Sequence, residues 1–100
     1  MEIELYFWAG CPSHDSARDL LEDVLRERGI DDPVTLREVF TIEEAQELRF
    51  PGSPTIRIDG RDVDPAGADG RPALGCRIYR RPDGRAWPLP SREQIEEALR

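Results

Sequence analysis

The sequence predicts one α/β domain over residues 1–100, with helices on both faces of a four-stranded sheet. Three observations support this prediction. Short runs that are apolar or alternate between apolar and polar residues are typical of strands, and along the chain they alternate with segments of helical periodicity. The resulting order is β-α-β-α-β-β, followed by an extra small hairpin and a closing helix. A chain of 100 residues has room for only one core.

The first two strands are expected over residues 2–9 and 34–40, with a helix between them. Pro12 stands where the first turn of a helix tolerates proline, and Gly29 is a natural stop. Between them lies an apolar helical face formed by Ala17, Leu20, Leu21, Val24 and Leu25. We expect a right-handed crossover that leaves the two strands parallel.

The second helix is predicted to begin at Ile42, because Thr41 and Glu44 form a capping box. Pro51-Gly52 is expected to end it. The third strand, residues 55–59, alternates cleanly and runs into the tight-turn signal Asp59-Gly60. We expect this strand to be antiparallel to the first.

Residues 61–64 are expected to return as the fourth strand, and residues 65–75 to form a loop. Residues 76–80 and 85–87 then predict a smaller hairpin. A capping box formed by Ser91 and Gln94 opens the closing helix. The apolar face of that helix consists of Ile95, Ala98 and Leu99.

Composition and charge exclude several classes of function. The formal net charge of −7 disfavours nonspecific nucleic-acid binding, and the hydrophobic runs are too short to span a membrane. The absence of lysine excludes a Schiff-base catalyst. The first residues carry acids where a signal peptide needs basic residues, so a cytoplasmic location is expected. No cofactor and no resident metal are predicted.

The two cysteines, Cys11 and Cys76, are too few for a disulfide scaffold. One interpretation is that they are reduced thiols that serve as small buried apolar residues. Cys11 also has a chemical interpretation, because it precedes the first predicted helix. At an N-cap position, unpaired backbone N–H groups and the helix dipole lower the pKa of a thiol.

Two motifs stand out, Gly10-Cys11-Pro12-Ser13-His14 before the first predicted helix and Gly52-Ser53-Pro54-Thr55 before the third predicted strand. The first resembles the active-site turn of the thioredoxin/glutaredoxin superfamily, and the second resembles its cis-proline loop. Four shorter motifs resemble small bacterial proteins labelled thioredoxin family or alkylmercury lyase: Cys-Pro-x-His, Phe-Pro-Gly-Ser-Pro-Thr, Asp-Gly-Arg-Asp-Val and Gly-Cys-Arg-Ile-Tyr. The resemblance implies a thioredoxin-like three-layer sandwich.

The resemblance also implies roles for individual residues. Cys11 would be the nucleophile of the active-site turn, and Pro12 would contribute to substrate binding. A cis Ser53–Pro54 bond would present the backbone groups of Ser53 beside Cys11, where they can pair with an extended substrate segment. This expectation rests on the motif, since only about 5% of X-Pro bonds are cis.

His14 occupies the place of the superfamily's second cysteine, so the usual dithiol pair is missing from this turn. It lies three residues after Cys11 and projects from nearly the same helical face. It can therefore stabilise the thiolate as an imidazolium, relay a proton or ligate a soft metal. The alternative is a half-exposed polar residue of the first turn.

The position of Cys76 depends on which segment is the fourth strand. If residues 61–64 form it, the chain returns to the Cys11 end, and the following loop can hold Cys76 within disulfide reach. If residues 76–80 form it, Cys76 starts at the far end, too distant to bridge. The Asp59-Gly60 turn favours the first alternative.

Three functions follow as hypotheses. The first is a thiol–disulfide oxidoreductase with Cys11 as nucleophile and Cys76, or an external thiol, as resolver. Its partner would be a protein or a low-molecular-weight thiol or disulfide. The second is a module that binds a soft metal or an organomercurial through Cys11, Cys76 and His14. The third is a redox-inactive domain that binds a protein partner.

Overall fold

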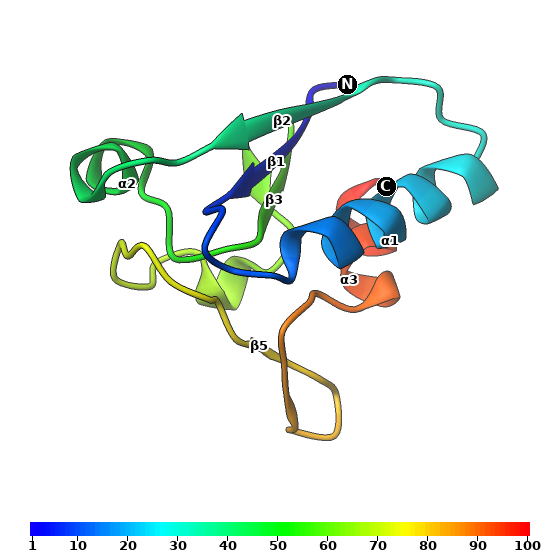
Figure 1. Ribbon diagram of the computed structural model, residues 1–100. Helices are drawn as coiled ribbons and strands as arrows, with labels where there is room; N and C mark the ends of the chain where they lie inside the picture. Colours follow the sequence, from blue (N-terminus) through cyan, green and yellow to red (C-terminus); the bar gives the residue numbers. More distant parts are fainter.

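A computed structural model describes all residues from 1 to 100. Its main sheet has the strand order β2-β1-β3-β4, and a separate two-stranded hairpin follows later in the chain (Figure 1). The strands are β1 (Ile3–Phe7), β2 (Val34–Glu38), β3 (Thr55–Ile58), β4 (Arg61–Asp62), β5 (Tyr79–Arg80) and β6 (Ala86–Trp87). The helices are α1 (His14–Glu27), α2 (Ile42–Leu48) and α3 (Arg92–Ala98), with a short 3₁₀ turn at Pro65–Gly67.

The sheet is mixed, as the sequence predicts. Strand β1 lies between a parallel neighbour, β2, and an antiparallel neighbour, β3, so that Leu5 stands opposite both Leu36 and Ile56. Strand β4 then pairs antiparallel with β3 through the turn at Asp59-Gly60. The last strand of the sheet therefore leads the chain back toward the end at which β1 leaves the sheet.

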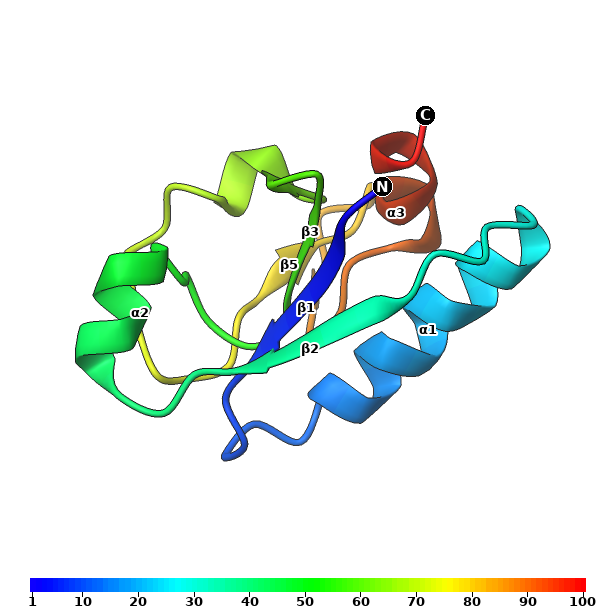
Figure 2. The same cartoon turned by 90° about the horizontal axis from the view of Figure 1, so that it is seen from above.

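Helices cover both faces of this sheet (Figure 2). Helices α1 and α3 pack on one face over the larger apolar cluster, which includes Leu5, Leu21, Ile56 and Ile95. Helix α2 covers the other face, where a smaller cluster consists of Tyr6, Val39, Ala45 and Phe50. No helix is long and apolar enough to cross a membrane.

Helix α1 begins later than predicted, and Cys11 is not its N-cap. The N-cap is Ser13, whose carbonyl accepts the first helical hydrogen bond, from the N–H of Ala17. The N–H of Cys11 instead donates to the carbonyl of Trp8 and closes a separate tight turn. Because that turn must end before the helix can start, Cys11 lies two residues before the N-cap.

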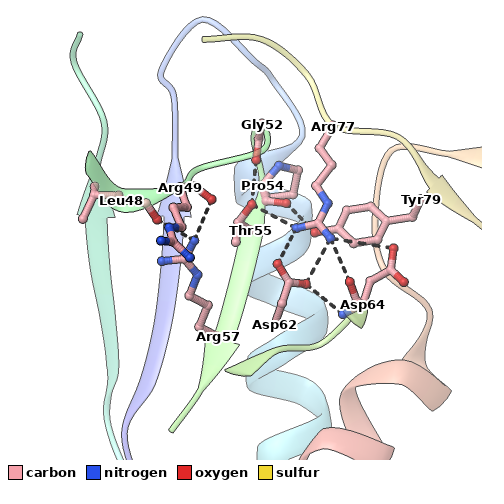
Figure 3. A network of polar contacts seen from close by, with 10 residues as sticks. All are labelled: Leu48, Arg49, Gly52, Pro54, Thr55, Arg57, Asp62, Asp64, Arg77 and Tyr79. Carbon is pink, nitrogen blue, oxygen red and sulfur yellow. Dashed lines mark hydrogen bonds and ion pairs between the residues drawn. The ribbon is translucent and has the colours of Figure 1, made fainter. Parts of the chain in front are cut away.

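Helix α2 begins at Ile42, as predicted, but ends before Pro51-Gly52. Arg49 adopts a left-handed conformation with φ of 51°, which stops the helix after Leu48. The guanidinium of Arg57 donates to the carbonyls of Leu48 and Arg49, at 2.8 and 3.0 Å (Figure 3). A side chain from the sheet thus satisfies carbonyls at the helix end.

The small hairpin is shorter than predicted. Only Tyr79–Arg80 and Ala86–Trp87 pair, and the hairpin does not include Cys76. Residues 75–77 precede the hairpin and run beside Ser53, with which Cys76 forms an isolated parallel β-bridge. The closing helix α3 begins with the full capping box of Ser91 and Gln94, as predicted.

Candidate active site

The two thiols meet although 65 residues separate them in the sequence. Cys11 lies in the turn between β1 and α1, and Cys76 lies in the segment that precedes β5. Their sulfurs are 2.7 Å apart, and the Cys76 thiol donates a hydrogen bond to Sγ of Cys11. Both cysteines are free thiols. Of the two alternatives for the fourth strand, this geometry agrees with the one in which β4 returns the chain to Cys11.

The segment around Cys76 is attached to the loop before β3 by backbone hydrogen bonds. The N–H of Ser53 donates to the carbonyl of Gly75 at 2.8 Å, and the N–H of Arg77 donates to the carbonyl of Ser53 at 2.7 Å. The Ser53–Pro54 bond is cis, as predicted. Both backbone groups of Ser53 are therefore used within the chain, so neither is free for an extended substrate as the resemblance implied.

Arg77 anchors the same segment from its other side, as part of a buried polar network that we call the Arg77 cluster (Figure 3). Its side chain is only 4% exposed and forms two hydrogen bonds to the carboxylate of Asp62, at 2.9 and 3.0 Å. It also donates to the hydroxyl of Thr55 at 3.1 Å and to the carbonyl of Asp64 at 3.3 Å. A paired and hydrogen-bonded charge of this kind is costly to disrupt.

Tyr79 and Gly52 complete the attachment. The guanidinium of Arg77 lies 4.4 Å from the centre of the Tyr79 ring, and the Tyr79 hydroxyl donates to the carbonyl of Pro54. Gly52 has φ of +124°, and a Cβ atom placed there would lie 3.0 Å from Cβ of Arg77. Only glycine combines that backbone conformation with so close an approach.

Cys11 is completely buried, and its surroundings favour the thiolate. Burial alone would raise the pKa of its thiol, but hydrogen bonds from Cys76, Ser13 and Ser53 outweigh that effect and bring the pKa below its ordinary value. The hydroxyl of Ser53 is buried and has no other hydrogen-bond partner. In the neutral state the Cys11 thiol lies 3.5 Å from the carbonyl of Ser53, to which it donates.

Cys76 differs from Cys11 in both exposure and acidity. It is exposed to solvent, whereas Cys11 has 0% of its surface exposed. Its pKa is raised, first because its thiol donates a hydrogen bond to Cys11, and then through partial burial and the nearby negative charge of Cys11. At the first ionisation of the pair, the negative charge therefore resides on Cys11 and the proton on Cys76.

His14 does not contact either thiol. Its ring stacks on Phe7, with the ring centres 4.6 Å apart, and Nδ1 donates to the carbonyl of Cys11 at 2.8 Å. A carbonyl can only accept, so the proton of the neutral ring is on Nδ1. The other nitrogen lies 3.6 Å from the carboxylate of the exposed Asp15. His14 therefore positions the backbone of Cys11.

A shallow groove of about 220 Å³ lies beside Cys76. Its lining includes Pro12 from the active-site turn and Ile78 and Trp87 from the hairpin, but not Cys11. Ile78 is 65% exposed and Trp87 is 45% exposed, so the walls are apolar and open to solvent. Of the residues predicted to bind substrate, Pro12 is the one that faces this groove.

Compared with protein-family models, curated proteins and solved structures, the chain matches none. Its functional interpretation therefore depends on the site itself. That site is a pair of thiols in contact, one buried and acidic and the other exposed and protonated.

The Arg77 cluster is not predictable from the sequence. Arg77 and Asp62 are 15 residues apart, and no local periodicity joins a buried arginine before β5 to a carboxylate on β4. Neither position follows a pattern from which this pairing could be predicted.

Proposed function

We propose that this protein is a thiol–disulfide oxidoreductase with a thioredoxin-like fold, and that Cys11 and Cys76 are its redox pair. One observation supports this above all: the two sulfurs are 2.7 Å apart, and the Cys76 thiol donates a hydrogen bond to Sγ of Cys11. A disulfide bond is about 2.05 Å long, so little movement separates the dithiol from the oxidised state. His14 occupies the place of a second cysteine in the turn, and Cys76 supplies that thiol from elsewhere in the chain.

The reaction is a transfer of two electrons. The protein dithiol reduces a disulfide of a protein or of a low-molecular-weight compound to two thiols, and the Cys11–Cys76 disulfide forms. The two protons of the dithiol end on the two product thiols. A low-molecular-weight thiol or dithiol then returns the protein to its reduced state. Exchange needs a thiolate, and the lowered pKa of Cys11 supplies one to the pair.

The geometry favours this proposal over the binding of a soft metal. Two zinc–sulfur bonds of about 2.3 Å at a tetrahedral angle hold the sulfurs roughly 3.8 Å apart. The sulfurs would therefore have to move apart by about 1 Å to chelate an ion. His14, the expected third ligand, directs Nδ1 to a backbone carbonyl, and no group of three potential ligand side chains gathers anywhere in the chain.

Catalysed reduction of insulin by dithiothreitol tests the proposal. We expect the wild-type protein to accelerate the reaction, and Cys11→Ser and Cys76→Ser each to abolish the acceleration, because either change removes half of the pair. Ser16→Ala, at an exposed position on helix α1, is the matched control and should match the wild type. A wild-type protein that gives no acceleration would leave the redox-inactive binding domain as the better hypothesis.

A further inference from the structure

The two thiols of the candidate redox pair are not equally accessible. Cys11, with the lower pKa, has 0% of its surface exposed, while Cys76 is exposed. A substrate disulfide consists of two bonded sulfurs that each carry a carbon substituent, and one of these sulfurs must contact the thiol that attacks it. A thiol with no exposed surface cannot make that contact. In the reduced protein, Cys76 stands between Cys11 and the groove formed with Pro12, Ile78 and Trp87.

We propose that Cys76 is the thiol that attacks the substrate disulfide from this groove, and that the buried Cys11 is the resolving thiol. This inference rests on the proposed function and reverses the order that the motif Cys11-Pro12-Ser13-His14 suggests. It names the thiol on which the mixed disulfide with the substrate forms.

The segment that carries Cys76 is held too firmly to turn aside and uncover Cys11. Backbone hydrogen bonds join Gly75 and Arg77 to Ser53 on both sides of Cys76. The side chain of Arg77 is then tied to Asp62 and Thr55 in the interior. A route by which the substrate reaches Cys11 directly would have to break these contacts, whereas a route through Cys76 breaks none of them.

The geometry also suits the second step. In thiol–disulfide exchange, the entering and leaving sulfurs stand on opposite sides of the sulfur that is attacked. Cys11 contacts Cys76 from the interior, and the groove opens on the solvent side. Once Cys76 carries the substrate, Cys11 is already positioned to displace it.

Cys11 first loses its own proton to solvent, which leaves the pair with one negative charge. The proton of Cys76 then moves to the Cys11 thiolate along their hydrogen bond, and the Cys76 thiolate attacks one substrate sulfur. The substrate S–S bond breaks, and its other sulfur leaves as a thiolate. Cys11 then loses its proton to solvent and attacks Sγ of Cys76, the mixed disulfide breaks and the second substrate sulfur leaves. Solvent protonates both products, so two electrons have passed from the protein to the substrate.

The raised pKa of Cys76 is compatible with this role. A thiolate of higher pKa is intrinsically the better nucleophile, although less of it is present at neutral pH. The contact with Cys11 offsets that shortage, because the buried thiolate accepts the proton that Cys76 must lose. The buried hydroxyl of Ser53, which has no other partner, remains available to Cys11 whenever it is ionised.

Alkylation of the reduced wild-type protein tests the order of attack without any substitution. A limiting amount of iodoacetamide is added at neutral pH, the protein is digested, and mass spectrometry gives the label on each cysteine. We expect Cys76 to be labelled at least about tenfold faster than Cys11, because access decides between them. Faster labelling of Cys11, or equal labelling of the two, would overturn the proposal.

Trapping with glutathione disulfide separates this inference from the proposed function. We expect Cys11→Ser to accumulate one glutathione on Cys76, and Cys76→Ser to accumulate none, because Cys11 stays covered by residues 75–77. If the wild type forms its internal disulfide but only Cys76→Ser traps glutathione, the pair is functional and the proposed order is wrong. If the wild type forms no internal disulfide, the proposed function itself fails.

Discussion

The ionisations of Cys11 and Cys76 are linked through the hydrogen bond between their sulfurs, and this link is measurable. The first ionisation of the pair should fall below the ordinary thiol pKa of about 8.5, and the second should lie above it. Thiolate absorbance at 240 nm, followed against pH, should therefore rise in two separated steps. Tyrosinate should not interfere, because burial raises the pKa of both Tyr79 and Tyr6.

Alanine variants assign the two steps. Cys76→Ala removes the strongest hydrogen bond to the Cys11 thiolate, so the pKa of Cys11 should rise and its thiolate should appear at higher pH. Cys11→Ala removes the sulfur that accepts the hydrogen bond from the Cys76 thiol, so the pKa of Cys76 should fall toward its ordinary value. A single step at the ordinary thiol pKa in the wild type would show that the sulfurs are not coupled.

A substitution at His14 tests whether the one histidine of the chain acts on the thiol. His14→Phe keeps a ring against Phe7 and removes the hydrogen bond to the carbonyl of Cys11, together with the longer contact to the exposed Asp15. We expect a loss of about 0.5–1.5 kcal/mol in the free energy of unfolding. The first thiolate step at 240 nm should stay where it is in the wild type. A clear rise in the pKa of that step would mean that His14 stabilises the thiolate after all.

At the level of elements, the position of Cys76 depends on how closely residues 75–77 approach the loop before β3. Gly52→Ala should separate them, because the new Cβ would lie 3.0 Å from Cβ of Arg77 and 3.2 Å from its backbone. The variant should lose more than about 1–2 kcal/mol, the usual cost of a left-handed non-glycine residue, and should oxidise to the internal disulfide more slowly.

Gly29→Ala is the matched control for that substitution. Gly29 also has a positive φ, of +67°, but no atom lies within 4 Å of the added Cβ. It should lose about 1–2 kcal/mol in urea unfolding and oxidise at the wild-type rate. Equal rates of oxidation in the two variants would show that the approach at Gly52 does not position Cys76.

The elements that the sequence predicts correctly are those with local causes. The helix starts at Ile42 and Arg92 follow from the side chains of Thr41 and Ser91, which bond within one turn. The sequence predicts the start of α1 too early. Cys11 has no capping side chain of this kind, and its N–H closes a separate turn with the carbonyl of Trp8 before the helix begins. The end of α2 has no such signal: Arg49 is not a residue that typically adopts the left-handed conformation, and the carbonyls there are satisfied by Arg57 from the next strand.

For the candidate site, the sequence predicts which ends of the strands lie together but not the detailed contacts. The Asp59-Gly60 turn favoured a fourth strand that returns the chain to Cys11, and the structure agrees. Which backbone groups meet Ser53 was not predictable. Residues 75–77 reach it through the buried pairing of Arg77 with Asp62, a contact between segments far apart in sequence.

At the scale of the whole molecule, the core is small: 24 of 100 residues are buried, and the two apolar clusters contain 11 and 4 of them. A cross-link should therefore matter for stability. A bond between cysteines 65 residues apart restricts the unfolded chain by about 4 kcal/mol. The oxidised protein should unfold at a higher urea concentration than the reduced protein by a corresponding amount, and Cys76→Ser should show no difference between the two conditions.

If Cys11 and Cys76 form one redox pair, mild oxidation must join them within one chain, and intact mass spectrometry detects that bond. The protein is equilibrated with oxidised dithiothreitol, remaining thiols are blocked with iodoacetamide, and the mass is recorded before and after reduction. The account predicts a monomer that has lost two hydrogens, carries no blocked thiol and recovers both thiols on reduction. Two blocked thiols after oxidation, or a disulfide found only between two molecules, would contradict it.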